Sequence, residues 1–300
     1  MIKLTPLLTE VTKRSQQLRK PLFMAALTRG QFRSAYNKML EKREIFRGVS
    51  GSAAYPYWIV QPGKSQRVSR NTSNFYTGLI DGLPSWKNYP KRSRSIICSN
   101  NYDGAHSFGN VLRVFPKNGA KIGICPAEDF WMSFNDTVHK RLGLADMSFF
   151  NAYFISIFFA CSGTLADMAA KLDEDTYSEF IKKLNGKIDI KLYISAIRYQ
   201  EKMDKLPYGV DGKRLIDDAE NYFRGNWEQY FDDLLDSERN GFQVQTIENY
   251  TRTETSYNEV WTDATSLMLS YNASQELLQS PTNIKLPKQP GEPDLSGIEI

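Results

Sequence analysis

The sequence predicts an α+β protein in which a split β-sheet core carries amino-terminal helices and a helical insertion. Two groups of short strand patterns predict the sheet, one within residues 44–128 and the other within residues 242–271. Between them, residues 129–241 have apolar side chains at helical spacing. The late strands have no sheet of their own, so we expect them to pair with the early ones. A single domain over residues 1–280 follows from this arrangement.

Residues 1–43 are predicted to form a basic helical arm. The stretches LTEVTKRSQQLRK and RGQFRSAYNKMLEKRE place apolar residues at roughly helical spacing among basic ones. The arm contains ten Lys and Arg and only two acidic residues. We expect it either to dock an acidic target or to pair with acidic residues of the helical insertion, for example Asp232, Asp233 and Asp236.

The first strand group contains five stretches that are bounded by Gly, Pro, Asn and Asp. They read EIFRGV, YWIVQP, SIICSN, VLRVFP and KIGICP. Their content of β-branched and aromatic residues is typical of strands. The turn sequence PKNGAK separates the last two and predicts that they form a hairpin.

The helical insertion and the second strand group follow along the chain. Helices are predicted for TLADMAAKL, TYSEFIKKL, LYISAIRYQEKM and WEQYFDDLL, and strands for FQVQTI, EVWTDA and SLMLSY. The most apolar run, FFNAYFISIFFAC, has 13 residues, whereas a membrane-spanning helix needs about 20. We expect it to be a buried helix or a segment that touches a membrane without crossing it. Residues 281–300 are polar and rich in Pro, which predicts a flexible tail.

Composition argues against several classes of site. The chain has three cysteines without a CxxC pair and only two histidines, so neither a structural zinc site nor a disulfide framework is expected. The sparse cysteines are typical of a protein made in a reducing compartment. The amino-terminal residues lack the apolar core of a signal peptide.

Charge is distributed unevenly along the chain. Residues 1–100 carry 18 Lys and Arg against four Asp and Glu, and the remaining 200 residues carry 20 against 30. A front part this basic is expected to face an acidic partner. That partner is either nucleic acid, the phosphates of a nucleotide, or the acidic rear part of the same chain.

Three residues on predicted strands suggest a chemistry. Arg47 stands in FRG on the first strand, Ser99 in SIICSN on a middle strand, and Glu259 in NEVWTD on a late strand. This order resembles the arginine–serine–glutamate class of mono-ADP-ribosyltransferases. The sequence around these motifs is similar to the ADP-ribosyltransferases proposed for tailed bacteriophages. The similar stretches include NTSNFYTGLIDGLPSWKNYPKRSRSIICS, FGNVLRVFPKNGAKIGICPAEDFW and NGFQV. The resemblance covers about residues 44–130 and 240–270.

The resemblance implies a cleft between two small β-sheets that binds NAD. A guanidinium is a planar fork of donors that matches phosphate oxygens, so Arg47 would hold the pyrophosphate. Gly48 would let its backbone approach the nicotinamide amide, since it has no side chain. Glu259 would be the catalytic carboxylate that stabilises positive charge on the ribose, and Ser99 would orient it by a hydrogen bond.

The chain departs from the family pattern at two positions. The usual Ser-Thr-Ser motif is replaced by Cys98, Ser99 and Asn100, and Ser95 is a competing candidate for the serine. Members that modify arginine have a glutamate two residues before the catalytic one, where this chain has Tyr257, while Glu254 lies five residues before. The acceptor therefore stays open between arginine, another side chain, nucleic acid and water.

Two further stretches are candidate contacts for NAD. Asn71 and Asn74 in NTSNFYT would bond the ribose or nicotinamide, or would instead cap a helix. The loop NNYDGAHSFG follows the serine strand, and in the family this loop folds over the nicotinamide. Its aromatic residues Tyr102, His106 and Phe108 would stack there or pack on their own scaffold.

The resemblance implies an NAD-dependent mono-ADP-ribosyltransferase that is encoded by a phage and modifies a host macromolecule. It uses NAD as co-substrate and needs no metal. Its expected location is the host cytoplasm, either after synthesis there or after delivery in the virion. The alternatives are an NAD glycohydrolase, with water as acceptor, and a virion or nucleic-acid-binding protein that kept the fold without the chemistry.

Overall fold

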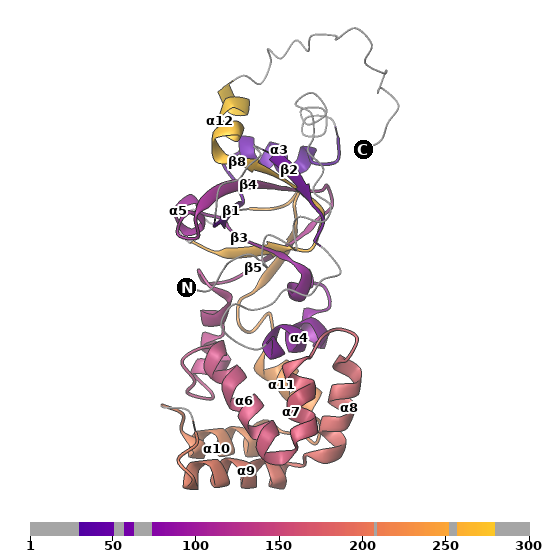
Figure 1. The fold of residues 1–300 in the computed structure, drawn as a ribbon, viewed down its shortest axis with the longest axis vertical. Coiled ribbons are helices and arrows are strands. Elements are labelled where there is room, and N and C mark those ends of the chain that lie inside the picture. Colours follow the sequence, from indigo (N-terminus) through magenta and orange to yellow (C-terminus); the bar gives the residue numbers. More distant parts are fainter. Residues whose placement is uncertain (1–29, 51–56, 63–73, 207–208, 252–256, 280–300) are drawn as a thin grey trace. The chain divides into compact units, whose positions relative to one another are not determined.

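The computed structural model describes residues 30–50, 57–62, 74–206, 209–251 and 257–279. It confirms the α+β class, because a mainly antiparallel sheet and a set of α-helices account for most of the described chain (Figure 1). The chain divides into two compact units. The sheet unit comprises residues 1–65, 95–124 and 244–300, and the helical unit comprises residues 66–94 and 125–243.

In the described residues, eight strands form one sheet with the order β2-β8-β4-β1-β3-β7-β5-β6. The strands are β1 (Phe46–Val49), β2 (Tyr57–Val60), β3 (Ile96–Ser99), β4 (Asn110–Pro116), β5 (Lys121–Ile124), β6 (Gln243–Thr246), β7 (Glu259–Thr262) and β8 (Ser266–Ser270). Strands from the end of the chain, β7 and β8, pair with β3, β4 and β5. The expected pairing of late strands with early ones is confirmed.

The sheet consists of two halves that meet at a single pair of residues. On one side β1 pairs with β4 over four residues, and on the other β3 pairs with β7 over four residues. Within the described chain, the register between β1 and β3 consists of one pair, Phe46 opposite Ser99. Beyond that pair no register joins β1 and β3 in the described residues, and we call this break in the pairing the opening of the sheet.

The predicted hairpin of β4 and β5 is wrong. β4 lies between β1 and β8, and β5 lies between β7 and β6. Both edges of β4 are therefore occupied, and the PKNGAK turn leads the chain from one half of the sheet to the other. The turn is closed by a hydrogen bond of 2.9 Å from Ala120 N to Lys117 O. Its Gly119 has a φ of +75°, which favours glycine.

The larger apolar cluster of the sheet unit includes part of the predicted arm. Helix α3 (Arg33–Leu40) and the residue before it contribute Phe32, Ala35, Tyr36 and Met39 to the cluster that also holds the inner face of the strands. The carboxyl-terminal end of the arm is thus core, because its apolar stripe covers the sheet. The remainder of the arm, residues 1–29, lies outside the described residues, as does the tail.

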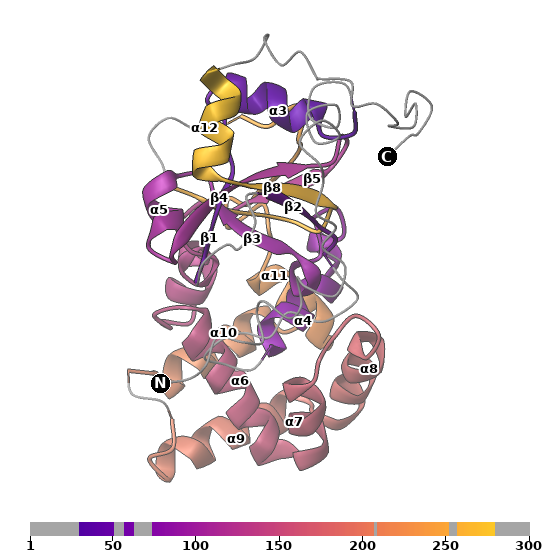
Figure 2. The same cartoon turned by 45° about the horizontal axis from the view of Figure 1, so that its top comes forward.

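Two short elements cover the region around Phe46. Helix α5 (Tyr102–His106) and the start of α12 (Tyr271–Gln279) contact it through Tyr102, at 6.0 Å between ring centroids, and Tyr271, at 6.4 Å. Figure 2 shows α5 beside β1 and α12 beside β8. Arg113 on β4 is buried there and pairs with Glu44, with 2.5 Å between Nη2 and Oε1.

The helical unit contains most of the predicted insertion and one segment from the predicted β core. Its α-helices are α4 (Phe75–Gly82), α6 (Met147–Cys161), α7 (Gly163–Ala170), α8 (Tyr177–Lys187), α9 (Ile190–Lys202), α10 (Gly212–Tyr222) and α11 (Trp227–Leu234). Short helical turns occur at Pro84–Trp86, Arg92–Arg94, Phe130–Met132 and Asn135–His139. Residues 75–94 are therefore helical and group with the insertion, although they were placed in the β core of residues 44–128.

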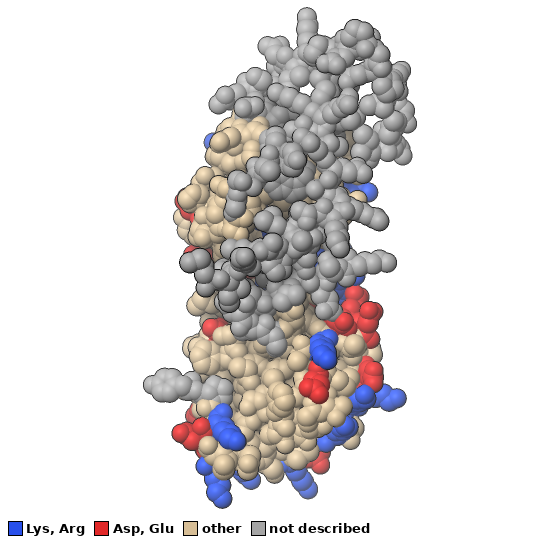
Figure 3. Space-filling view, viewed as in Figure 1, with Lys and Arg blue, Asp and Glu red and all other residues tan. Residues whose placement is uncertain are grey.

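The apolar run FFNAYFISIFFAC forms most of α6, and its side chains fill the core of the helical unit. Phe150, Phe154, Ile157 and Phe158 are completely buried. In the described ranges, no helix combines the length and the apolar character that a membrane crossing requires. On the face drawn in Figure 3, charged side chains lie mostly along the rim of this unit.

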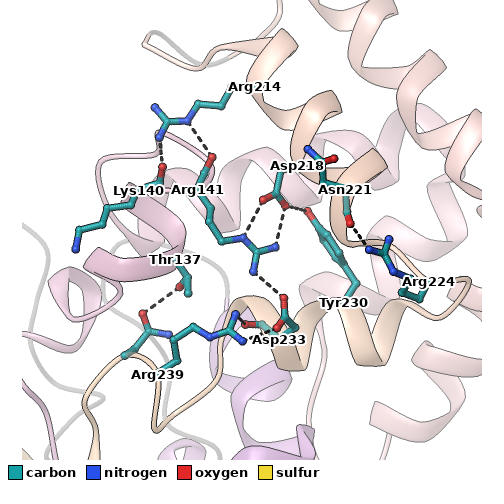
Figure 4. Close-up of polar contacts among 11 residues, drawn as sticks. Thr137, Lys140, Arg141, Arg214, Asp218, Asn221, Arg224, Tyr230, Asp233 and Arg239 are labelled. Carbon is teal, nitrogen blue, oxygen red and sulfur yellow. Dashed lines mark hydrogen bonds and ion pairs between the residues drawn. The ribbon is translucent and has the colours of Figure 1, made fainter.

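A polar network ties the last helices of this unit together (Figure 4). Arg141 donates to Asp218 at 2.8 Å and to Asp233 at 2.7 Å, and the Tyr230 hydroxyl donates to Asp218 at 2.8 Å. Arg239 also pairs with Asp233, at 2.8 Å. The acids considered as partners for the arm thus have partners of their own within the helical unit, since Asp232 also accepts from Ser85 N and Asp236 from Arg239 N.

Candidate active site

The sheet brings Ser99 and Glu259 side by side. Ser99 ends β3, Glu259 begins β7, and the two residues are direct partners in the antiparallel register. Directly opposite residues carry their side chains on the same face of a sheet, at a Cβ separation of about 5 Å. Ser95 precedes β3 at its other end, where Ile96 faces Thr262. Ser99 rather than Ser95 is therefore the serine that adjoins Glu259.

Two asparagines fix this register, and sequence reasoning missed their role. Asn100 and Asn258 are buried, and Asn100 Nδ2 donates to Asn258 Oδ1 at 3.0 Å. Asn258 N donates to Asn100 Oδ1 at 2.8 Å, and Asn100 N donates to Asn258 O at 3.1 Å. We call this pair the asparagine clasp. Because its members directly adjoin Ser99 and Glu259, it holds the serine and the carboxylate at one place along the strands.

The turn after β3 holds the Ser99 hydroxyl. Asn101 N donates to Ser99 Oγ at 3.1 Å, and the Asn101 side chain caps α5 by accepting from Gly104 N at 3.0 Å. The capping asparagine is favoured at this position because it satisfies a helix N–H that has no partner within the helix. The predicted hydrogen bond between Ser99 and Glu259 stays a prediction.

Arg47 reaches into the opening between β1 and β3. Along a strand, the main-chain N–H and C=O groups of successive residues point alternately to the two neighbouring strands. Ile45 O accepts from Val114 N at 2.9 Å, so Ile45 points toward β4. The main-chain groups of Arg47 therefore also point toward β4, and those of Gly48 point toward β3. By the same alternation, the bond from Asn100 N to Asn258 O turns the Ile97 carbonyl toward β1. The Arg47 guanidinium donates to that carbonyl at 3.1 Å.

The Arg47 guanidinium thus lies where the main-chain pairing between β1 and β3 ends. If β1 and β3 continued to pair beyond Phe46 and Ser99, the next bonded pair would be Gly48 with Ile97. Instead the Arg47 side chain bonds the Ile97 carbonyl, and the main chain of Gly48 faces the opening. Ser99 and Glu259 share the sheet face of Phe46, and Arg47 leaves β1 on the opposite face, so its guanidinium reaches the break through the edge of β3, at the Ile97 carbonyl.

Close packing against α5 gives a second reason for glycine at position 48. A Cβ atom there would lie 1.9 Å from Ala105 O and 2.8 Å from the Cβ of Phe108. Any side chain would displace the backbone of α5, so glycine is required by the packing of the sheet unit itself. This structural demand accounts for the glycine of FRG without reference to a ligand.

Cys98, between Ile97 and Ser99, is buried in the apolar core. Burial raises the pKa of its thiol to about 12, while Arg47 opposes the rise and Glu259 adds to it. Cys98 is therefore a neutral thiol at physiological pH and not a nucleophile. The described residues also contain no group of three His, Cys, Asp or Glu side chains that could hold a metal ion.

The three aromatic candidates in the loop after β3 differ in how far they are exposed to solvent. Tyr102 packs on its own scaffold, against Phe46 and at 4.6 Å between ring centroids from Tyr271. Phe108 is 69% exposed and is followed by Gly109, whose φ is +120°. Only Phe108 and the exposed His106 are thus presented to solvent among the three candidates.

The remaining candidates belong to the helical unit, to the residue two before Glu259, or to segments outside the described residues. Asn74 precedes α4 in the helical unit, while Asn71 and Glu254 lie outside the described residues. The ligand role of both asparagines stays a prediction. Tyr257, two residues before Glu259, is 49% exposed.

Comparisons of the chain with protein-family models, with curated proteins and with solved structures gave no match.

Proposed function

We propose that the protein is an NAD-dependent mono-ADP-ribosyltransferase. The observation that carries this proposal is the placement of Arg47, Ser99 and Glu259 on the neighbouring strands β1, β3 and β7, beside the break in pairing between β1 and β3. The opening between two halves of a sheet also supports the split-sheet core that the sequence resemblance implies.

The residues of the opening suit the chemical groups of NAD. A guanidinium has five N–H donors in a rigid fork that matches phosphate oxygens. The bond to Ile97 holds Arg47 in place, so it would meet the pyrophosphate at little further cost in side-chain entropy. The main chain of Gly48 offers one donor and one acceptor toward the opening, which is the pattern that the carboxamide of nicotinamide complements.

The carboxylate of Glu259 suits the bond that must break. When the bond between the nicotinamide nitrogen and ribose C1′ breaks, its electron pair leaves with nicotinamide, and positive charge develops on the ribose. A carboxylate fixed beside that carbon stabilises the charge. The acceptor's nucleophilic atom then bonds C1′ and loses its proton. The asparagine clasp keeps Glu259 in position for this step.

The acceptor is a host macromolecule in this proposal, and the protein acts in the host cytoplasm after synthesis there or delivery by a virion. Tyr257 stands where arginine-modifying members of the family have a glutamate, so the proposal does not extend to arginine as the acceptor. If water accepts the ribose, the same site is an NAD glycohydrolase. A protein that binds neither NAD nor an acceptor would instead be an inactive or structural member of the fold.

Labelled NAD separates these outcomes. The purified protein is incubated with NAD labelled on the adenylate, with and without bacterial lysate, and free nicotinamide and macromolecular label are both measured. Glu259→Gln should lower turnover by roughly 10²–10³-fold, the range for a group aimed at developing charge. Glu248→Gln, a change of a glutamate outside the opening, is the matched control.

Arg47→Ala should weaken NAD binding by roughly 1.5–3 kcal/mol, as expected for loss of a charged hydrogen-bonding group. Isothermal titration calorimetry measures this, with Arg43→Ala as control and a melting curve to verify folding. Nicotinamide release without macromolecular label would favour the glycohydrolase. A folded wild-type protein that neither binds NAD nor releases nicotinamide would overturn both activities.

A further inference from the structure

The helical unit carries a concentrated positive charge from the end of α8 through α9. Residues 125–243 contain 14 Lys and Arg against 21 Asp and Glu, an excess of negative charge. Seven of these 14 basic residues fall within residues 182–205, which contain only three acidic ones. In Figure 3, blue side chains lie along the lower edge of the unit, where Figure 1 labels α9 and α10, with red ones among them. A basic segment thus stands on an otherwise acidic unit.

The basic residues of helix α9 are exposed and lie on one face of the helix. Asp189 caps its amino terminus by accepting from Leu192 N at 2.8 Å, and Tyr193 and Ile197 are buried. Lys191, Arg198 and Lys202 are exposed. Their positions are i, i+7 and i+11, which lie on one face of a helix, so the three cations span about 16 Å at a rise of 1.5 Å per residue. We call these three residues the α9 stripe.

The stripe differs from the other surface cations of the unit in its partners. Lys140, Lys183 and Lys213 each pair with a carboxylate four residues away on the chain. For the stripe residues, the part of the chain that the structure describes offers no such ion pair within 4.0 Å. The three cations are therefore not held in such pairs and can attract an external anion.

A second line of exposed residues follows the stripe along α9. Leu192 is 41% exposed, Tyr199 is 55% exposed and Met203 is 47% exposed. Tyr199 thus places an aromatic ring beside the cations, where it can pack against the sugars of a nucleic acid whose phosphates the cations contact.

We infer that the α9 stripe binds the phosphate backbone of a nucleic acid. A linear row of cations suits a linear polyanion, whose charges repeat at short intervals along its length. Binding of this kind is independent of base sequence and weakens steeply as salt is added. This binding involves neither NAD nor the opening in the sheet, so it is independent of the proposed enzymatic function.

Binding to a 20-base-pair duplex of mixed sequence tests the inference. Fluorescence anisotropy of the full chain is measured at several salt concentrations, and the same probe is made as RNA. The stripe variant is Lys191→Gln, Arg198→Gln and Lys202→Gln together. The matched control is Lys140→Gln, Lys183→Gln and Lys213→Gln together, which removes the same charge from the same unit.

The stripe variant should bind at least tenfold more weakly than wild type at about 0.1 M salt, and its slope of log K against log salt should fall by about 2 to 3. The control variant should stay within about twofold of wild type. Equal weakening in both variants would overturn the stripe as a site, since it would show only a general charge effect. The same holds if wild type does not bind the duplex.

Vesicles that contain phosphatidylserine serve as the competing probe. Wild type that binds these vesicles through the stripe but does not bind the duplex would overturn the assignment in favour of a membrane surface. Circular dichroism verifies the fold of each variant. If the triple variant does not fold, Lys191→Gln and Lys202→Gln are measured singly, and each should lower the salt slope by about 1.

Discussion

The asparagine clasp predicts a ranked pair of stability losses. Asn100→Ala removes two side-chain hydrogen bonds, from Asn100 Nδ2 to Asn258 Oδ1 and from Asn258 N to Asn100 Oδ1. Asn258→Ala removes only the first of them, because the other two bonds of the clasp use its main chain. The two variants are otherwise the same chemical change at buried positions.

The magnitudes follow from these bonds. A net loss of about 1 kcal/mol per hydrogen bond, and about 1–3 kcal/mol when a buried group loses its partner, gives about 1–2 kcal/mol for Asn258→Ala and about 2–4 kcal/mol for Asn100→Ala. The double variant should show a coupling of about 1 kcal/mol for the shared bond. Urea unfolding followed by circular dichroism measures all three free energies of unfolding.

Asn118→Ala is the matched control. Asn118 also makes two side-chain bonds in the sheet unit, with Ser34 N at 2.9 Å and Gly30 O at 3.2 Å, but it is exposed. Water replaces its lost partners, so we expect less than about 1 kcal/mol. The reasoning is refuted if Asn258→Ala costs as much as Asn100→Ala, or if the exposed control costs as much as either.

The clasp also predicts a split between catalysis and binding, provided that the proposed activity exists. Because Asn258 adjoins Glu259, Asn258→Ala should lower kcat for nicotinamide release at least tenfold, since misplacement by about 1 Å costs up to about 10²-fold. NAD affinity should change by less than about threefold. An equal loss of affinity would show that the clasp maintains the whole opening rather than the carboxylate.

Two further predictions concern packing and pH. Gly48→Ala should lower the free energy of unfolding by about 3 kcal/mol, at the upper end of overpacking costs, because its Cβ would meet the backbone of α5; Gly186→Ala, which meets nothing within 4 Å, should raise it by about 0.5–1 kcal/mol in the same urea experiment. For Asp233, burial alone would raise the pKa, but hydrogen bonds from Arg239 and Arg141 hold the pKa below its usual 3.8. Its stabilising effect is therefore present above about pH 4 and lost as the pH falls further, so Asp233→Asn should flatten the acid-side decline of stability, and an unchanged decline would contradict this.

The sequence by itself determined where most of the strands and many of the helices lie, although it missed the helical residues 75–94. Strand patterns such as EIFRGV and SLMLSY and helical patterns such as TYSEFIKKL lie where the structure has β1, β8 and α8. These signals are local, because burial of one face imposes a period of about two or 3.6 residues on the chain. The order of Arg47, Ser99 and Glu259 on three strands was likewise visible in the sequence.

Only the tertiary structure decided how the strands meet. The PKNGAK turn has the local chemistry of a hairpin, yet β4 has β1 and β8 as neighbours, and no local signal reports that both of its edges are taken. The same limit applies to the clasp, whose asparagines are 158 residues apart in the chain. Glycine at position 48 fits a ligand contact in the sequence, but the Ala105 carbonyl that forbids a side chain there comes from a different element. Pairing and close packing depend on partners distant in sequence, so they appear only when the chain is folded.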